Sequence, residues 1–460
     1  MQANNHETED DLWRYNARDC VYTREVGEAE AIALIERGLS DVDAFQQRLF
    51  FPVLNCMIRG VRVDLKEKAR LSHYLQGEVD RRQEWLDRVC GHPLNVNSNK
   101  QMKQLFYDDL RLPTVWKRTP TGKVATLDDG AIEILKAKEI LTRPIFRKIQ
   151  ELRAIKKMKS DWAEMRLDED LRARTSYNLC GTKTYRFSSS ENAFGTGRNL
   201  QNVTNKKGDG ESDIDLDLPD VRTMFIPDPG YEWFDIDLSK ADLRTVVWES
   251  DCREMKAMLA EGRDPYIEMA REFYRDPTIK KTNPDGTLNK KYQDFKSFAH
   301  GTNFLGTPQG LAQRIGLTVH EASRTQAWYF GHYPAIKKWQ EAFCEEVRRT
   351  HRVSNRFGYT FDFLGRVDDS TLREAIAWIP QSATGCVINR IWMNIHERYP
   401  HLLEVLMQVH DSLDGQFRVE RREEAIAALE ECGKVIVPYD DPMVIPIGIK
   451  TSTKSWGNCS

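Results

Sequence analysis

Two stretches of the chain each place an aspartate inside a run of apolar residues. Residues 234–238 read Phe-Asp-Ile-Asp-Leu, and residues 406–413 read Leu-Met-Gln-Val-His-Asp-Ser-Leu. We expect both to be strands, on which a carboxylate is costly to bury unless it is paired, hydrogen-bonded or bound to a metal. If the fold brings Asp411 beside Asp235 and Asp237, which share one strand face, the carboxylates form a divalent-metal site. Two such ions about 4 Å apart can activate an attacking hydroxyl and stabilise a leaving oxygen.

A second chemical pattern is a helix that carries a lysine and aromatic rings on one face. Lys296, His300 and either Asn303 or Phe304 follow one another at steps of three or four residues, which is the spacing of neighbours on a helix surface. A lysine there can hold the charge of a triphosphate, and an aromatic ring one turn further on can stack on a base. The alternative is an ordinary helix with a surface lysine and a core aromatic.

A third pattern is a basic helix expected over residues 143–159, with seven Lys or Arg residues and one acid. Its apolar residues recur every three or four positions, so the basic side chains fall on the outer face. This face is either solvated or lies along phosphates, where each neutralised charge releases counterions. The net charge of the whole chain, −3, does not by itself indicate a nucleic-acid binder.

The composition places these patterns in a globular enzyme. A chain of 460 residues has room for several subdomains with cores of their own, and 40% hydrophobic with 30% charged residues is typical of a soluble protein. No apolar run is long enough to span a membrane and the N-terminus is polar and acidic, so we expect no membrane span, no signal peptide and a cytoplasmic location, in the host if the protein is viral. The nine cysteines include no Cys-x-x-Cys pair, which favours reduced thiols.

The elements that must position these residues are mostly helices around a few strands. In chain order we expect a helix over 11–38, a helical pair over 41–90 broken near Gly60–Asp64, a helix capped by Ser98 or Asn99, a turn at 119–123, an exposed acidic loop at 206–220, helices over most of 251–345, then a strand, a helix over about 420–434 and a last strand near 445–449. Helices inserted between the two aspartate strands predict a split sheet domain and an α+β architecture.

The two aspartate motifs resemble those of a known enzyme family. Residues 237–244, Asp-Leu-Ser-Lys-Ala-Asp-Leu-Arg, are similar to the first catalytic motif of family A DNA polymerases, Asp-Tyr-Ser-Gln-Ile-Glu-Leu-Arg. Residues 408–412, Gln-Val-His-Asp-Ser, resemble the family's third motif, Gln-Val-His-Asp-Glu. The family includes bacterial DNA polymerase I and many phage replicases. The resemblance implies that Asp237 and Asp411 are the catalytic residues and the ligands of two Mg²⁺ ions, with the carbonyl of Leu238 as a further ligand.

One departure from the family lies directly after the second aspartate. Ser412 stands where the family has Glu, and a serine cannot supply a negative charge there. A third carboxylate is therefore absent or comes from elsewhere in the chain. Asp235 receives no role from the resemblance and stays a neighbour of the motif.

Other residues of the first motif and of the lysine helix are implied in binding the dNTP. They are Ser239, Lys240, Asp242, Lys291, Lys296, His300 and Phe304. His300 stands where the family has Phe or Tyr, so the stacking ring is smaller. Tyr292 replaces the family's arginine, and we expect Lys291 or Lys290 to take over its phosphate contact. Asp242 is one methylene shorter than the family's Glu, and we expect it to exclude a ribose 2′-hydroxyl less strictly.

The resemblance also implies contacts to DNA. Thr184–Ser189 is similar to Thr-Gly-Arg-Leu-Ser-Ser, and Asn199–Val203 is similar to Asn-Leu-Gln-Asn-Ile. The implied DNA-binding residues are Arg186, Asn199, Gln201, Gln381, Gln408 and His410. Arg186 would reach minor-groove acceptors that all base pairs share, which suits an enzyme that is blind to sequence. For Gln381 the alternative is a polar structural role.

The resemblance runs from about residue 50 to the C-terminus and implies a right-hand fold with an antiparallel-sheet palm, helical fingers and a helical thumb. The expected division is an exonuclease-like remnant at 1–27, a connector and first palm segment at 28–64, the thumb at 65–160, palm at 161–250, fingers at 251–345 and palm at 346–460. Tyr15–Asp19 resembles the motif that closes the family's proofreading exonuclease domain, whose other carboxylates would precede this chain. We therefore expect no proofreading here, and a separate exonuclease or processivity subunit as a partner.

The function implied is template-directed addition of dNTPs to the 3′-hydroxyl of a primer on template DNA, as in DNA replication and in a phage-like form. Two alternatives remain. A single-subunit RNA polymerase shares the palm, but Asp242 and Arg186 argue against it. A non-catalytic DNA-binding remnant is suggested by Ser412, Tyr292 and the missing nuclease.

Overall fold

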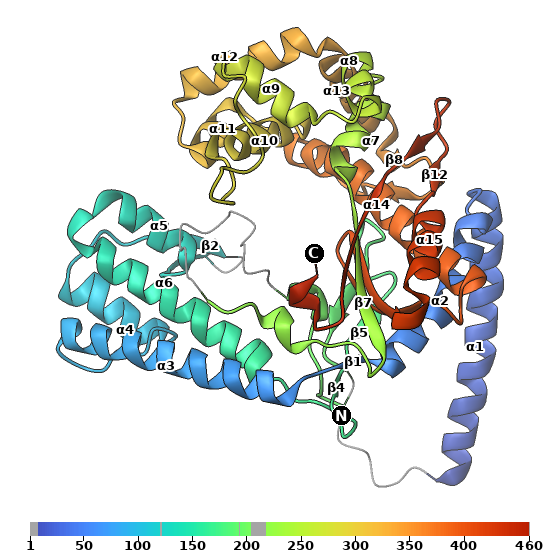
Figure 1. The fold of residues 1–460 in the computed structure, drawn as a ribbon, viewed down its shortest axis with the longest axis horizontal. Helices are drawn as coiled ribbons and strands as arrows, with labels where there is room; N and C mark the ends of the chain where they lie inside the picture. Colours follow the sequence, from blue (N-terminus) through green and yellow to red (C-terminus); the bar gives the residue numbers. More distant parts are fainter. Residues whose placement is uncertain (1–7, 120–121, 193, 204–217, 460) are drawn as a thin grey trace.

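The structure is a computed structural model that describes residues 8–119, 122–192, 194–203 and 218–459 (Figure 1). The helices are α1 (Glu9–Glu36), α2 (Ser40–Arg59), α3 (Leu65–Cys90), α4 (Asn99–Lys103), α5 (Asp129–Lys138), α6 (Arg143–Met158), α7 (Ala241–Glu249), α8 (Arg253–Ala260), α9 (Pro265–Tyr274), α10 (Lys290–Asn303), α11 (Pro308–Ile315), α12 (Val319–His332), α13 (Pro334–Thr350), α14 (Asp369–Arg398) and α15 (Arg422–Cys432). The strands are β1 (Val61–Arg62), β2 (Trp116–Thr119), β3 (Gly122–Ala125), β4 (Arg172–Ala173), β5 (Ser176–Asn178), β6 (Ser188–Ser190), β7 (Tyr231–Leu238), β8 (Arg352–Ser354), β9 (Thr360–Asp362), β10 (Glu404–Val409), β11 (Ser412–Arg418), β12 (Ile436–Val437), β13 (Met443–Val444) and β14 (Ile447–Ser452). This mixture confirms the α+β class.

A four-stranded antiparallel sheet, in the order β10-β11-β7-β14, forms the centre of the fold. β7 is an inner strand, and its Asp237 lies opposite Ser412 on β11 and Gly448 on β14. Residues of a strand alternate between the two faces of a sheet. Phe234 and Ile236 are therefore buried on one face, and Asp237 lies on the other.

Two helices cover the face of the sheet that is turned away from Asp237. Ile388 of α14 and Leu429 of α15 belong to one hydrophobic core with Phe234 and Phe417 of the sheet. α14 is buried along most of its length. The opposite face of the sheet carries the site residues and the C-terminal end of the chain, which Figure 1 shows beside the strands.

Two helical bodies flank the sheet (Figure 1). One contains α3, α4, α5 and α6, and its core includes Leu75, Phe106 and Phe146. The other contains α8, α9, α10, α12 and α13, and its core includes Met255 and Phe295. Each body buries its own hydrophobic residues, so the sheet can hold both in place through a small number of connections.

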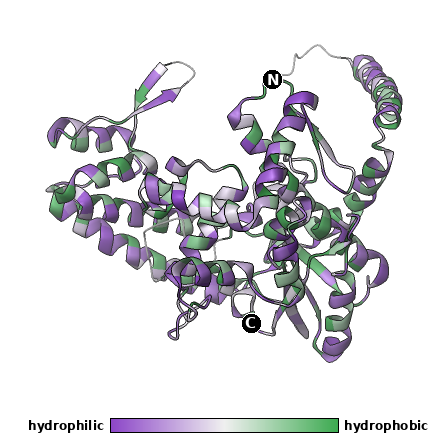
Figure 2. Ribbon diagram, turned by 90° about the horizontal axis from the view of Figure 1, so that it is seen from above, coloured by the Kyte–Doolittle hydropathy of each residue, from purple (hydrophilic) through white to green (hydrophobic). Residues whose placement is uncertain are grey.

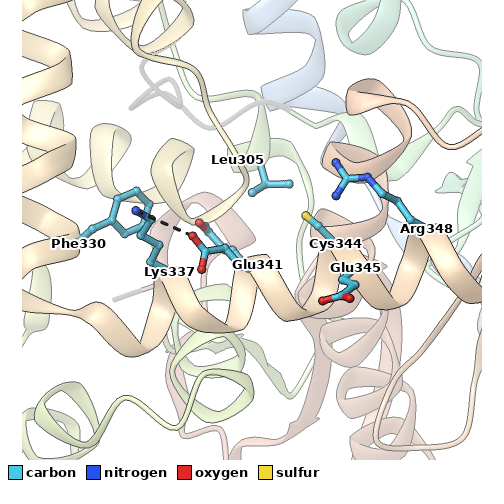
Figure 3. Close-up of a pocket in the computed structure, with 8 residues that line it drawn as sticks. Leu305, Phe330, Lys337, Glu341, Cys344, Glu345 and Arg348 are labelled. Carbon is cyan, nitrogen blue, oxygen red and sulfur yellow. Dashed lines mark ion pairs between the residues drawn. The ribbon is translucent and has the colours of Figure 1, made fainter.

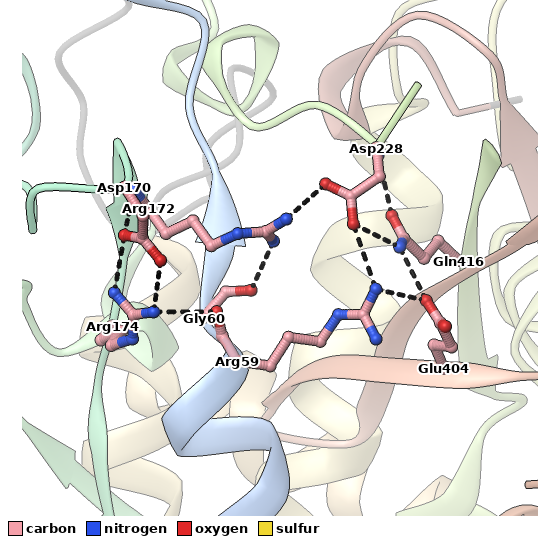
Figure 4. A network of polar contacts seen from close by, with 8 residues as sticks. All are labelled: Arg59, Gly60, Asp170, Arg172, Arg174, Asp228, Glu404 and Gln416. Atoms are coloured by element: carbon pink, nitrogen blue, oxygen red, sulfur yellow. Dashed lines mark hydrogen bonds and ion pairs between the residues drawn. The ribbon is translucent and has the colours of Figure 1, made fainter. Parts of the chain in front are cut away.

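The body that contains α3 is joined to the sheet through a polar network around the ribbon of β1 and β4 (Figure 4). Arg172 donates to Asp228 at 2.6 Å and to the carbonyl of Gly60 at 3.2 Å. Arg59 pairs with the same Asp228 at 3.1 Å and with Glu404 of β10 at 2.5 Å. These shared carboxylates fix the point at which the chain leaves the sheet for α3.

α1 stands apart from the rest of the molecule. None of its 28 residues is buried, and Trp13 and Ile35 are 66% and 70% exposed. In Figure 2, hydrophobic and hydrophilic residues alternate around this helix, which follows the grey N-terminal trace. Its residues match the helix expected over 11–38, with ends shifted by two residues.

The other expected elements are confirmed where the structure describes them. Gly60 separates α2 from α3 with φ at +66°, a region that favours glycine. Ser98 caps α4 by accepting a hydrogen bond from the backbone of Gln101. Parts of the turn at 119–123 and of the acidic loop at 206–220 lie outside the described residues. Across the described ranges, no helix is both long and apolar enough to cross a membrane.

α6 confirms the amphipathic helix expected over residues 143–159, with Phe146 on its buried face. Its basic side chains are largely engaged within the same body. Arg147 and Lys148 pair with Glu151 at 3.2 and 2.7 Å, and other members of the row bond to acids, amides and carbonyls nearby. The outer face of α6 is therefore less available to phosphates than the sequence indicates.

Candidate active site

The fold brings the two predicted aspartates together. Asp237 is the last residue but one of β7, and Asp411 directly precedes β11, the strand that pairs with β7. The backbone N–H of Leu238 donates to the carbonyl of Asp411 at 3.3 Å. The carboxylates, 174 positions apart (from 237 to 411), thus lie at one end of the sheet.

The expectation that both aspartates lie on strands is wrong for the second one. Asp411 and His410 form the two-residue turn between β10 and β11, and His410 has a positive φ of 54°. The apolar run therefore folds back on itself at His410, where a strand would have continued. The turn lets the Asp411 side chain meet the end of β7 without interrupting the ladder.

Negative charge accumulates at this end of the sheet. Asp237 has an exposed surface, but many protein atoms surround its carboxylate and partly desolvate it. This desolvation, together with the negative charges of Asp411 and Asp235, raises the pKa of Asp237 to about 6. Burial also raises the pKa of Asp411, which Asp242 raises further and the cation Arg186 lowers. Carboxylates that repel one another in a desolvated position form an environment that a divalent cation would neutralise.

The donor set at this point fits a magnesium-type cation, because it consists of carboxylate and carbonyl oxygens, and such a cation takes its other oxygen ligands from water or phosphate. No group of three or more His, Cys, Asp or Glu side chains in the described ranges is arranged to hold a metal. The predicted ligands at this point are two carboxylates, Asp237 and Asp411, with the carbonyl of Leu238. The hydroxyl of Ser412 donates to the carbonyl of Val409 at 2.8 Å and adds no charge.

The predicted nucleotide residues on α10 approach the same region. The imidazole Nε2 of His300 lies 3.4 Å from Oδ2 of Asp242 on α7. The rings of His300 and Phe304 meet edge to face, with centroids 4.6 Å apart, and Lys296 is exposed one turn before His300. Asn303 is buried and accepts a hydrogen bond from the hydroxyl of Tyr329. Phe304, and not Asn303, therefore continues the face of Lys296 and His300.

Two other predicted nucleotide residues are bound to acids of the protein. Lys240 lies 3.4 Å from Asp264, which caps α9. Lys291 lies 2.8 Å from Asp276 in the segment between α9 and α10. Tyr292, at the position of the family's arginine, is buried. The backbone N–H of Ser239, the remaining member of the set, donates to the carbonyl of Pro446 at 2.8 Å.

The predicted DNA-binding residues form two groups. Arg186 donates to the backbone carbonyl of Gln381 on α14 at 3.2 Å, so these two residues are neighbours. In the second group, the amide of Gln201 donates to Gln408 at 2.6 Å, and Gln408 donates to the carbonyl of His410 at 2.5 Å. Asn199 caps the short turn before Gln201. The side chain of His410 is exposed and takes no part in these hydrogen bonds among the described residues.

Sequence reasoning missed two residues next to the site. Asp414 is fully buried on β11, opposite Asp235, and its Oδ1 accepts from the indole of Trp233 at 3.0 Å. Trp456, near the C-terminus, donates to Asp235 at 3.3 Å. The only signal for Asp414 was its place in the alternation of the second strand, and Trp456 gave none because its contact depends on the tertiary fold.

A separate cavity of about 460 Å³ lies along α13, beside the residue that follows Phe304. Its lining includes Leu305, Phe330, Cys344 and the pair Lys337–Glu341 (Figure 3). None of the predicted site residues lines it.

Comparison with known proteins identifies the family. Residues 65–458 match the family model described as DNA polymerase family A. The chain belongs to this family. The resemblance to family A is thereby confirmed, and the two aspartate motifs and the lysine helix lie within the matched residues.

Family A relatives share the sequence along most of this chain. It is 29% identical over 431 residues to the thermostable DNA polymerase I of Thermus filiformis, a match that covers 90% of this chain and 47% of the relative. It is 26% identical over 432 residues to DNA polymerase I of Rhizobium leguminosarum, covering 90% of this chain and 39% of the relative. The chain thus spans about half or less of the length of these relatives.

A solved structure confirms the expected right-hand polymerase fold of family A. The POL domain of Pol1 from M. smegmatis, in complex with DNA primer-template and dNTP, matches with a TM-score of 0.76 at 21% identity. The match covers 92% of this chain and 72% of that chain.

Proposed function

We propose that this chain is a template-directed DNA polymerase that adds dNTPs to the 3′-hydroxyl of a primer. The observation that carries the proposal is the meeting of Asp237 and Asp411 at one end of the sheet, in a family A chain, with Asp242 bonded to His300 on the neighbouring helix. Asp237, Asp411 and the carbonyl of Leu238 would hold two Mg²⁺ ions, whose charge would favour attack by the hydroxyl and departure of pyrophosphate.

The residues of α7 and α10 bind the dNTP in this proposal. Lys296, exposed on α10, holds the triphosphate, and the rings of His300 and Phe304 face the base and the templating pair. Asp242 contacts the sugar. Ser239 and Lys240 adjoin the phosphates, and Lys291 would have to exchange Asp276 for a phosphate to take part. Their work is mostly positioning and charge neutralisation.

The DNA lies along the second set of residues in this proposal. Arg186 and Gln381, which are bonded to each other, reach the minor groove of the primer-template. Asn199, Gln201, Gln408 and His410 line the path of the primer end, where the hydrogen-bonded amides of Gln201 and Gln408 order the turn that carries Asp411.

The three bodies of the fold support a division of the chain into thumb, fingers and palm. We assign the thumb to residues 65–160 with α3 to α6, the fingers to 251–345 with α8 to α13, and the palm to 161–250 and 346–460 with the central sheet. Residues 28–64 connect to the palm through β1. We assign residues 1–27 to an exonuclease-like remnant, and residues 9–27 of this stretch belong to the uncovered helix α1.

A primer-extension assay tests the function. The wild-type chain is expected to extend a DNA primer with dNTPs and Mg²⁺ but not without the metal. Asp411→Asn should slow extension by about a hundredfold or more, whereas Asp440→Asn, which removes an exposed charge near β13, should leave it unchanged. Extension with rNTPs alone would instead support an RNA polymerase. DNA binding without any extension would support the non-catalytic alternative.

A further inference from the structure

Because Ser412 supplies no carboxylate beside Asp237, the other acids on the same sheet face are the candidates for a third negative charge. Strand register places Asp235 between Asp414 of β11 and Lys450 of β14. Ser412 lies opposite Asp237, one position further along the same face. Asp235 is therefore a second acid on the open face of β7, two residues from the proposed metal ligand.

The C-terminal turn holds the side chain of Asp235. The indole Nε1 of Trp456 donates to Asp235 Oδ2 at 3.3 Å. Trp456 is itself fixed: its backbone N–H donates to the carbonyl of Phe225 at 2.9 Å, the guanidinium of Arg222 lies 4.2 Å from its ring centroid, and its ring stacks on Trp233. A buried indole with these contacts has little freedom to follow another partner, so it keeps Asp235 in place.

The neighbour of Asp235 on β11 is an acid that is fully shielded from solvent. Asp414 is fully buried, and its Oδ2 finds no hydrogen-bond partner among the described residues. Burial, with the charge of Asp235 beside it, raises the pKa of Asp414 well above its usual value, which disfavours a charge on Asp414. Of these two acids, Asp235 is only partly buried and lies two positions from Asp237 on the same strand face.

We propose that Asp235, positioned by the indole of Trp456, supplies the negative charge that Ser412 lacks beside the divalent-cation site. It acts through space on the cations that Asp237 and Asp411 would hold, and Trp456 is a positioning residue. This inference rests on the proposed function of the site. It gives the second acid of the first motif a role that the family resemblance left open.

Mn²⁺ binding to the free protein tests the inference without primer or nucleotide. The dissociation constant is measured by electron paramagnetic resonance of unbound Mn²⁺ for the full chain. Asp235→Asn is expected to raise it about 3- to 10-fold, the scale for losing one charge near a divalent ion at a partly solvated site. Asp440→Asn makes the same charge change at an exposed position and should not alter it.

A double variant that moves the negative charge to the adjacent strand distinguishes an electrostatic role of Asp235 from a structural one. Adding Ser412→Glu to Asp235→Asn should return the dissociation constant to within about twofold of wild type, because it restores the charge beside Asp237. A merely structural aspartate would not be rescued this way. An unchanged Mn²⁺ affinity in Asp235→Asn, or a failure of Ser412→Glu to rescue it, would overturn the proposal.

The positioning role of the indole has its own variant. Trp456→Phe keeps an aromatic ring, though a smaller one, and every carboxylate, but it removes the Nε1–H donor; it should weaken Mn²⁺ binding by less than Asp235→Asn does. Wild-type Mn²⁺ affinity in Trp456→Phe would overturn that role. If Asp235→Asn fails to fold, Trp456→Phe still tests the proposal. Primer extension by the wild type is a separate measurement. Failure of the proposed function would appear as no extension by the wild type, whereas failure of this inference would appear as unchanged Mn²⁺ binding in the variants.

Discussion

His300 and Asp242 join two segments that are 58 positions apart, with the imidazole Nε2 of one 3.4 Å from a carboxylate oxygen of the other. The contact ties α10 of the helical body to α7, which follows directly on the strand that carries Asp237. The charge of Asp242 also raises the pKa of Asp411, so α10 and the carboxylates share one electrostatic environment. Changes in either residue are therefore expected to affect substrate selection.

Lengthening the acid at position 242 should sharpen the choice between deoxyribose and ribose. Asp242→Glu restores the methylene that the family has and brings the carboxylate closer to the sugar, where it would exclude a 2′-hydroxyl. We expect the ratio of kcat/KM for a dNTP over its matching rNTP to rise severalfold in single-nucleotide extension. Equal ratios in wild type and variant would contradict the assignment.

Removing the lysine of α10 should weaken nucleotide binding more than it slows the chemistry. Lys296→Ala loses a cation that would face the triphosphate, and we expect the KM for dNTP to rise about tenfold, or about 1.4 kcal/mol. Steady-state extension over a range of dNTP concentrations measures it. Lys337→Ala on α13, whose lysine lies beside Glu341, is the matched control and should keep the wild-type KM. A fall in kcat alone would argue against the phosphate contact.

The buried acid of β11 should make stability depend on pH. The pKa of Asp414 is raised in the folded state, so above about pH 4 the unfolded chain ionises this group while the folded protein retains the proton. The unfolded state then binds fewer protons, and the free energy of unfolding falls as pH rises towards the folded pKa. In Asp414→Asn this contribution is absent.

Thermal unfolding over a pH series checks the sign. The Tm of Asp414→Asn relative to wild type should increase between about pH 5 and about pH 8. The asparagine amide keeps an oxygen that can accept the hydrogen bond from Trp233. Asp440→Asn should run parallel to wild type. A Tm difference that does not change with pH would mean that Asp414 ionises in the folded protein.

The glycine between α2 and β1 should not tolerate a side chain. Gly60 has φ at +66°, and an added Cβ would lie 2.6 Å from Cγ of Arg174 and 2.9 Å from the carbonyl of Ala173. Gly60→Ala is expected to lower the free energy of unfolding by more than about 1 kcal/mol, measured by urea denaturation. Gly27→Ala in α1, where a Cβ meets nothing within 4 Å, is the control and should not destabilise the protein.

The sequence predicted the parts of the site that depend on local patterns. Alternation in residues 234–238 placed Asp237 on the open face of its strand, and helical spacing put Lys296 and His300 on one face of α10. The turn at His410 was hidden, because an apolar run on both sides of a two-residue turn looks like one strand. The ion pair of Lys291 with Asp276 could not be foreseen either, since it depends on how the segment before α10 folds back.

Cross-strand neighbours were the other part that sequence could not supply. Asp414 and Lys450 flank Asp235 only because of the register of three strands drawn from distant segments. The contact of Trp456 with Asp235 needs in addition that the last turn of the chain folds onto the open face of the sheet. Such relationships are set by tertiary packing, and no local spacing encodes them.

The strand order of the central sheet governs when the site can form during synthesis. β7 pairs with β11 and β14, so the strand that carries Asp237 waits for two partners that end at Arg418 and Ser452. At about 5–20 residues per second, the ribosome needs roughly 10 to 40 s to make the 214 residues from 238 to 452. The intervening helical body, with its own core, can fold meanwhile. The carboxylate pair is thus among the last features to assemble, and a stalled chain would carry a folded α10 without the proposed catalytic centre.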